Sequence, residues 1–201
     1  MAVPGKNMTI YVSLLRAVNV GGANRVRMAY LSDMLGGMGF ESVQTLLQSG
    51  NVVFRGNAMS TQKLEKDLEG KVLRDIGLRT DFFVRTASEW KDILTENPFP
   101  EEAESDPSHM VVALLKDSPR AAAWDALRGA ITGREKVQGA GRKAYIVYPD
   151  GIGRSKLTPT LIEGKLGTRA TSRNWNTVRK LDGLASARAQ AVTEVSTSKT
   201  A

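Results

Sequence analysis

The chain has 201 residues, of which 41% are apolar and 24% charged, a composition typical of a globular protein with one domain or two small subdomains. It contains no cysteine and no run of about 18 apolar residues, which excludes disulfides, thiolate nucleophiles, cysteine-based zinc sites and a membrane-spanning helix. The first ten residues lack a secretory signal pattern, so we expect a cytoplasmic protein without a membrane partner.

The net charge of +7 is unevenly distributed along the chain. Residues 1–117 carry 13 basic and 15 acidic side chains, a net charge of −2, whereas residues 118–201 carry 15 and 6, a net charge of +9. A basic half favours polyanionic partners such as nucleic acid, nucleotides or acidic proteins. A solvated basic surface that only keeps the protein soluble explains the charge equally well.

The first half of the chain follows a β-α-β-β-α-β pattern. Apolar, β-branched and helical spacings predict a strand at 9–15, a helix from Met28 to Met38, strands at 43–48 and 51–55 joined by a tight turn, a helix after Ser60 or Thr61, and a strand at 80–86. This order is that of the ferredoxin-like split βαβ arrangement.

The second half begins with a short helix at 88–99 and an acidic, proline-bounded segment at 100–107. We then expect a strand at 109–115, a helix at 118–129 capped by Ser118, strands at 135–138 and 143–149, and helices at 157–167 and 171–186. The sequence therefore predicts an α+β protein with two subdomains, each related to the ferredoxin-like arrangement: an N-terminal subdomain at 8–99, a linker at 100–107, a C-terminal subdomain with a terminal helix at 108–186, and a disordered tail at 187–201.

Standard catalytic and cofactor motifs are absent from the sequence. His109 is the single histidine, and it opens a predicted strand in a chain without a serine-elbow motif. One histidine and no cysteine argue against a transition-metal site. There is no Walker A motif, and the relaxed G-x-G-x-x-A pattern at 139–144 precedes a strand instead of joining a strand to a helix. We therefore expect no metal and no cofactor, and we assign no catalytic residue.

A polar loop, "RAVNVGGANRVRM" at 16–28, joins the end of the first strand to the start of the first helix. A helix start exposes unpaired N–H groups at the positive end of the helix dipole, and glycines let an anion approach the backbone. The loop is therefore either an anion site or a plain turn in which glycine supplies positive φ angles. Its candidate ligand-binding residues are Arg16, Asn19, Gly21, Gly22 and Asn24.

Two further polar clusters are candidates for the same site. Ser49, Gly50 and Asn51 form one cluster, although serine and asparagine also stabilise hairpin turns. Lys156, Arg173 and Asn174 form the other. On a helical wheel for 171–186, Asn174 falls on the apolar side with Trp175 and points towards the interior or a cleft. A buried amide needs partners, so Asn174 either clamps a neighbouring loop or contacts a ligand.

Five motifs in order carry a resemblance to a known family: "LLRAVNVGGANRVRM" (14–28), "LGGMGFESVQTLLQSGNVVF" (35–54), "ENPF" (96–99), "YPDGIGRSKL" (148–157) and "GTRATSRNWNTVRKL" (167–181). Over residues 9–182 the chain resembles the bacterial family catalogued as domain of unknown function 1697. The resemblance implies an α+β fold of two ferredoxin-related subdomains, and it transfers no activity and no catalytic residue.

We expect the three clusters to meet at the junction of the subdomains and to bind a phosphorylated ligand, either a nucleotide or the backbone of RNA or DNA. Arg16, Lys156 and Arg173 would pair with phosphate oxygens. One alternative is an enzyme that acts on a small anionic substrate, although no general base is evident. The other is a structural or protein-interaction domain without a ligand. The sequence specifies neither the ligand nor the oligomeric state.

Overall fold

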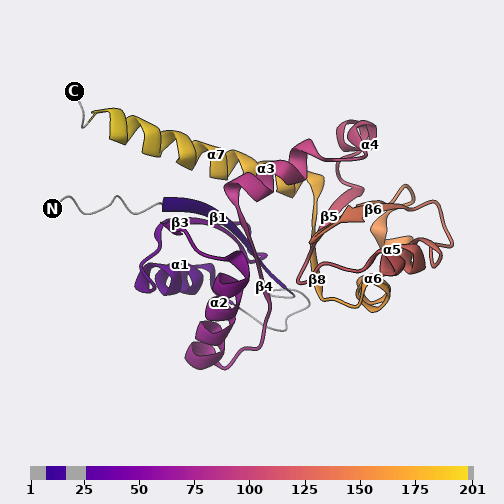
Figure 1. Ribbon diagram of the computed structural model, residues 1–201, viewed down its shortest axis with the longest axis horizontal. Coiled ribbons are helices and arrows are strands. Elements are labelled where there is room, and N and C mark those ends of the chain that lie inside the picture. The colour runs from indigo at the N-terminus through magenta and orange to yellow at the C-terminus, as the bar shows by residue number, and fades with distance from the viewer. Residues whose placement is uncertain (1–7, 17–25, 199–201) are drawn as a thin grey trace. The chain divides into compact units, whose positions relative to one another are not determined.

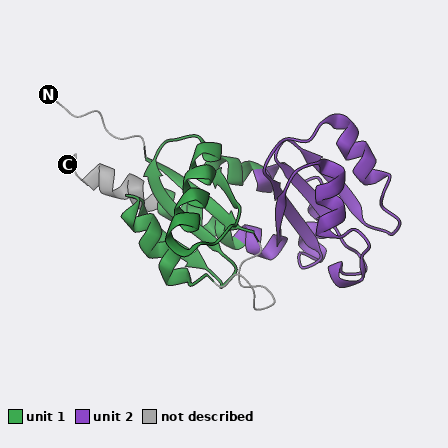
Figure 2. Cartoon of the chain, turned by 90° about the horizontal axis from the view of Figure 1, so that it is seen from below, with its two compact units in different colours: residues 1–92, 180–201 green, residues 93–179 purple. Residues whose placement is uncertain are grey.

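The computed structural model describes residues 8–16 and 26–198, with side chains described as far as residue 189. The chain divides into two compact units (Figures 1 and 2). Unit 1 comprises Met1–Asp92 and Lys180–Ala201, and unit 2 comprises Ile93–Arg179. No helix in the described part of the chain is long and apolar enough to cross a membrane.

Unit 1 is built on a four-stranded antiparallel sheet of order β2-β3-β1-β4. Its elements are β1 (Met8–Leu15), α1 (Met28–Gly37), β2 (Glu41–Leu46), β3 (Asn51–Asn57), α2 (Thr61–Ile76) and β4 (Phe82–Thr86), followed by α3 (Ala87–Thr95). The strand–helix–strand–strand–helix–strand order agrees with the sequence pattern.

The two faces of this sheet are covered differently. Tyr11 pairs with Phe54, and both pack against the buried side of α1 and α2, where Leu31 and Leu64 are fully buried. Because side chains alternate along a strand, the residues on either side of Tyr11 in β1 point to the opposite face of the sheet. On that face Arg188 of α7 (Trp175–Ser198) donates a hydrogen bond of 2.7 Å to Gln44, and α7 runs alongside β1 and β3 (Figure 1).

Unit 2 repeats the topology of unit 1 with a sheet of order β6-β7-β5-β8. Its elements are α4 (Pro100–Ser105), β5 (Met110–Leu115), α5 (Ala121–Arg128), β6 (Lys136–Ala140), β7 (Lys143–Val147), the 3-10 turn η1 (Ile152–Arg154), α6 (Pro159–Leu166) and β8 (Ala170–Asn174). Helices α5 and α6 contribute buried Trp124, Leu127 and Ile162 to the core beneath β5 and β7. On the other face, Tyr145 donates 2.8 Å from its hydroxyl to the Ile93 carbonyl of α3.

The predicted α+β class with two ferredoxin-related subdomains is confirmed, and the differences lie in the second half. The helix expected at 171–186 begins at Trp175, because residues 170–174 form β8, and it extends to Ser198. Helix α5 begins at Ala121 with Arg120 as its N-cap, so Ser118 is not the cap. The acidic segment expected to be a linker contains α4, with Pro100 in its first turn, and the boundaries between the units fall inside α3 and α7.

Candidate anion-binding site

The end of β1 is fixed by the loops that precede β3 and β4. Leu15 donates its N–H to the Gly50 carbonyl at 2.9 Å, and Arg16 donates its N–H to the Asp81 carbonyl at 3.0 Å. The Thr80 hydroxyl donates to the Arg16 carbonyl at 2.9 Å. Arg16 of the first cluster therefore lies beside Gly50 of the second cluster, although the sequence separates them by more than thirty residues.

The hairpin turn between β2 and β3 is stabilised from inside by Asn51. This side chain is fully buried, and its Nδ2 donates to the Leu46 carbonyl at 3.1 Å and to Ser49 Oγ at 2.8 Å. Gly50 has a φ of 72°, and Leu47 adopts the left-handed region at 61°. These contacts favour the turn alternative for this cluster, because the amide nitrogen of Asn51 is already used within the chain.

The N-cap residue of helix α1 is Arg27, which has an extended backbone and provides no side-chain cap, because a guanidinium group has no hydrogen-bond acceptor. The first turn of the helix contains no acidic residue. No carboxylate in the first turn of α1 therefore offsets the positive end of the helix dipole. The candidate residues Asn19, Gly21, Gly22 and Asn24 lie outside the described residues.

Asn174 ends β8 and caps α7. Its Oδ1 accepts the Thr177 N–H at 3.0 Å, and the residue is exposed. Of the two predicted directions, the interior is wrong, because the helical wheel assumed helix from 171 onward, whereas the direction towards a cleft stays a prediction. A polar edge strand carries no apolar periodicity that would have shown the boundary.

Arg173 precedes this cap and is mostly enclosed by protein. Its Nη1 donates to Thr171 Oγ1 at 3.1 Å and to the Ser172 carbonyl at 2.8 Å. Burial lowers the pKa of the Arg173 guanidinium to about 10, which still leaves the side chain charged at neutral pH. Arg173 thus presents a fixed positive charge near the start of α7.

Lys156 lies on an anchored loop between η1 and α6. Ser155 donates to a carboxylate oxygen of Glu135, and its Oγ accepts the Leu157 N–H at 2.9 Å. The Tyr148 hydroxyl donates to the Leu157 carbonyl at 3.2 Å. The Lys156 side chain is exposed on this rigid loop. Arg16 and Asn51 belong to unit 1, whereas Lys156, Arg173 and Asn174 belong to unit 2, so the expected meeting of the three clusters stays a prediction.

Unit 2 repeats the strand-end arrangement with different residues. Leu115 donates its N–H to the Arg142 carbonyl at 2.9 Å, and Lys116 donates its N–H to the Arg169 carbonyl at 3.0 Å. Lys116, Arg142 and Arg169 thus occupy the places of Arg16, Gly50 and Asp81. Arg120, the N-cap of α5, corresponds to Arg27 and likewise makes no capping hydrogen bond with its side chain.

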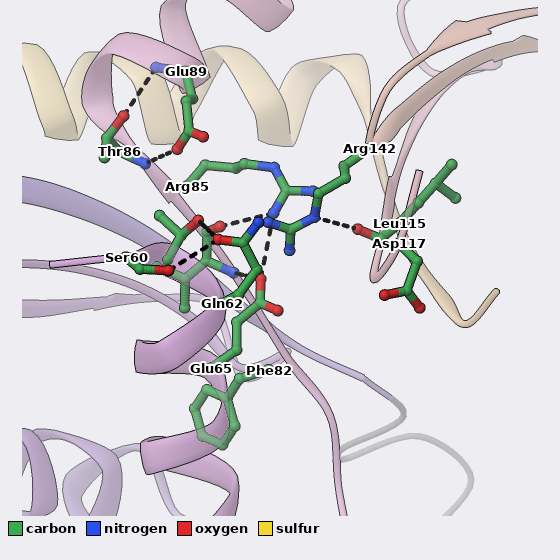
Figure 3. A network of polar contacts seen from close by, with 12 residues as sticks. Ser60, Gln62, Glu65, Phe82, Arg85, Thr86, Glu89, Leu115, Asp117 and Arg142 are labelled. Carbon is green, nitrogen blue, oxygen red and sulfur yellow. Dashed lines mark hydrogen bonds and ion pairs between the residues drawn. The ribbon is translucent and has the colours of Figure 1, made fainter. Parts of the chain in front are cut away.

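None of these four cations was predicted from the sequence as a site residue. They stand in three separate segments, and only the pairing of β5 with β7 and β8 brings the segments together. Aligning the two predicted β-α-β-β-α patterns would have shown that Lys116 occupies the position of Arg16. Figure 3 shows Arg142 at the end of β5, where its Nε donates to the Leu115 carbonyl at 3.3 Å.

The other polar group in Figure 3 secures the free edge of the first sheet. Glu65 Oε1 accepts the Val84 N–H at 2.9 Å and lies 3.4 Å from Arg85 Nη1, which also donates to the Val84 carbonyl at 2.7 Å. One turn further along α2, Glu69 accepts the Phe82 N–H at 2.9 Å. In unit 2, Glu163 of α6 accepts the Ala170 N–H of β8 at 2.8 Å. These carboxylates cover edge-strand amides and thus have structural roles.

The described residues give little support to metal or triad chemistry. No group of three histidine, aspartate or glutamate side chains among them is arranged to hold a metal ion. His109 Nδ1 lies 2.5 Å from Asp106 Oδ2 in an exposed turn, and Ser108 donates to the same carboxylate at 2.7 Å. These contacts lower the pKa of Asp106, Ser108 having the larger effect.

Comparisons with known proteins agree with this fold. The family model described as "Protein of unknown function (DUF1697)" matches residues 8–145. The solved structure of the conserved bacterial protein SP0830 from Streptococcus pneumoniae is similar, with a TM-score of 0.70 and 20% sequence identity. The match covers 89% of this chain and 99% of that one. A comparison with curated proteins found no match.

Proposed function

The chain belongs to the family of proteins of unknown function DUF1697, and we propose that it binds a phosphorylated ligand. The observation that carries the proposal is a repeated one. In each unit the first strand ends in a cation, Arg16 or Lys116, whose N–H is tied to the loop before the last strand. In each unit the following helix begins at an arginine with no side-chain cap.

This arrangement offers the groups that a phosphate needs. An arginine or lysine side chain supplies charge-assisted hydrogen bonds to phosphate oxygens. An uncapped helix start supplies N–H donors and the positive end of a dipole. Hydrogen bonds to two neighbouring loops hold the backbone at the end of each first strand. The main chain of the cationic residue is therefore already ordered, and ligand binding loses less conformational entropy.

Isothermal titration calorimetry with sodium pyrophosphate at low ionic strength tests the proposal. We expect saturable binding by the wild-type chain. Arg16→Ala and Lys116→Ala should each weaken it about tenfold, because a hydrogen bond to a charged group contributes about 1.5–3 kcal/mol. Lys63→Ala is the matched control, since Lys63 is an exposed lysine that pairs with Asp67 along α2.

Two outcomes would contradict the proposal. One is an absence of pyrophosphate binding by the wild-type chain, and the other is an equal effect of Lys63→Ala and Arg16→Ala. A fall in thermal stability of the Arg16 and Lys116 variants, without any binding to lose, would instead favour the structural alternative. The buried contacts of Asn51 are the observation that keeps this alternative open.

A further inference from the structure

The edge strands of the two sheets are protected to different extents. Successive residues of an edge strand point their main-chain N–H and C=O groups alternately towards the neighbouring strand and away from the sheet. In β4, glutamate side chains accept the outward N–H groups of Phe82, Val84 and Thr86 at 2.7–2.9 Å. In β8, Glu163 accepts the Ala170 N–H at 2.8 Å. The β4 edge is therefore closed to another strand, and the β8 edge is closed at its start.

The other two edges are β2 and β6, and they differ in regularity. The register of β2 with β3 shifts between Glu41 and Gln44, and Ser42 has a φ of 52°. Such a bulge twists an edge strand and hinders the addition of another strand. In contrast, β6 pairs with β7 in unbroken register over its whole length. The β6 edge is therefore the one with regular strand geometry.

Val137 and Gly139 point their main-chain groups out of the sheet at the β6 edge. The main chains of Arg142 and Tyr148, which flank β7, are bonded to β5 and to the residue before it. Strand alternation gives positions 144 and 146 the same direction, so the odd-numbered residues of β7 bond to the even-numbered residues of β6. The N–H and C=O groups of Val137 and Gly139 make no hydrogen bond with any residue that the structure describes.

We propose that β6 pairs with β6 of a second copy of this chain, antiparallel and with Gln138 on the twofold axis, so that the two unit 2 sheets become continuous. In this register Val137 of one copy faces Gly139 of the other, and each of these two pairs exchanges two hydrogen bonds. Lys136 faces Ala140, so no like charges oppose one another. The inference does not depend on the proposed function.

A second copy suits this edge because the edge is complementary to itself. Its two outward-pointing residues are two positions apart, and a twofold axis between them places each opposite the other. The Gln138 side chain is exposed and would lie beside its own copy, where two amides can bond to each other. On the opposite face, the Trp124 ring lies over Gly139 and would contact Val137 of the second copy. Two short strands form a small interface, so the association is weak.

Sedimentation velocity of the full chain over a range of concentrations tests for the dimer. We expect a monomer at low micromolar concentration and a rising fraction of dimer up to about 0.5 mM, as for other small interfaces.

A single cysteine tests the register, because the natural sequence contains none. The Cα atoms of the two Gln138 residues would lie about 4.5 Å apart, which is within the range that a disulfide spans. Mild oxidation of the Gln138→Cys variant should therefore give a covalent dimer. Ala140→Cys is the matched control on the same strand, because Ala140 is also exposed but would lie about 14 Å from its own copy. It should cross-link at least tenfold more slowly.

Charge exchange at Gln138 tests the same pairing without a cross-link. Gln138→Lys and Gln138→Glu each place two like charges opposite one another, so each variant alone should dimerise about fivefold more weakly than the wild type. An equimolar mixture should recover the dimer, because opposite charges then meet. Circular dichroism melts identify any variant whose fold has changed, and the recovery on mixing depends on pairing and not on stability.

Three outcomes would overturn the inference. A chain that remains a monomer at about 0.5 mM would leave β6 to another occupant, such as an extended peptide of a different protein. A dimer in which Ala140→Cys cross-links as fast as Gln138→Cys would place the interface elsewhere. Weaker dimerisation of both charge variants without recovery on mixing would contradict the pairing of Gln138 with its own copy.

Discussion

Glu65→Gln should destabilise unit 1 because it removes the carboxylate that lies beside the buried Arg85 guanidinium. Glu65 is 2% exposed and Arg85 is 4% exposed, and the two side chains lie 3.4 Å apart. Glutamine keeps the shape and can still accept the Val84 N–H, so the change removes charge and little else. The Arg85 guanidinium would then retain its bond to the Val84 carbonyl without the carboxylate.

The expected loss is about 3 kcal/mol of unfolding free energy. Removing one partner of a buried ion pair typically costs about 3–5 kcal/mol. The lower end applies because the 3.4 Å separation is long for a charge-assisted hydrogen bond. Solvent screening reduces the effect little, since both side chains are enclosed. Asp67→Asn is the control on the same helix, and it should cost less than about 0.5 kcal/mol because the Lys63–Asp67 pair is exposed.

A double-mutant cycle with Arg85→Met, followed by urea denaturation, measures the coupling. We expect the double variant to be more stable than the sum of the single effects by at least about 1.5 kcal/mol, because removing both charges leaves neither of them buried alone. Circular dichroism and tryptophan fluorescence should give coincident transitions for the analysis to apply. Additive effects within about 0.5 kcal/mol, or a Glu65→Gln loss no larger than that of Asp67→Asn, would refute the reasoning.

Three further predictions concern unit 2. Asn174→Ala should cost about 1 kcal/mol in thermal unfolding, whereas Asn174→Ser should retain most of the stability, because only a side-chain acceptor can cap Thr177. Gly139→Ala should lower the free energy of unfolding, measured by urea denaturation, by about 1–3 kcal/mol, because a Cβ would press on the Trp124 ring and lie 2.7 Å from the Lys143 carbonyl. Gly141→Ala is the control, because its Cβ would meet no atom within 4 Å and only the positive φ would contribute. The Ser155 hydrogen bond is the largest cause of the lowered pKa of Glu135, so Ser155→Ala should raise that pKa in an NMR titration. Because the folded-state pKa is depressed, the stability from this contact is present above the unfolded pKa and lost as the pH falls through the folded pKa.

The sequence predicted elements well where side chains alternate between a core and a second face. The strands at 9–15 and 51–55 combine β-branched and aromatic residues with clear turn signals, and both are present as β1 and β3. It failed at β8, because the residues of "ATSRN" form an edge strand whose pairing with β5 depends on residues nearly sixty positions away. Local patterns contain no information about such a partner.

The residues of the candidate site were also predicted only where a local sequence pattern marks them. Arg16 and the hairpin turn both stand at predicted strand ends, and the contact from Leu15 to Gly50 places them near one another. That they form a ligand site stays a prediction. Arg142 and Arg169 lie within the pattern at 139–144 and the motif at 167–181, and they were missed because only strand pairing in unit 2 brings these segments together. The G-x-G-x-x-A pattern at 139–144 also has a structural reason: Gly139 allows the Trp124 ring to lie against β6, which explains a glycine there without a dinucleotide.

The passage of α7 from one unit into the other has a consequence for biosynthesis. Unit 2 occupies one uninterrupted stretch, 93–179, whereas unit 1 also requires residues from Lys180 onward. A ribosome therefore releases everything that unit 2 needs before it releases the helix that supplies Leu181 and Ala185, both buried, to unit 1. Synthesis of unit 1 therefore begins before that of unit 2 and ends after it. Until α7 leaves the ribosome, this helix does not cover its apolar face of the unit 1 sheet, and the exposed face can associate with other chains.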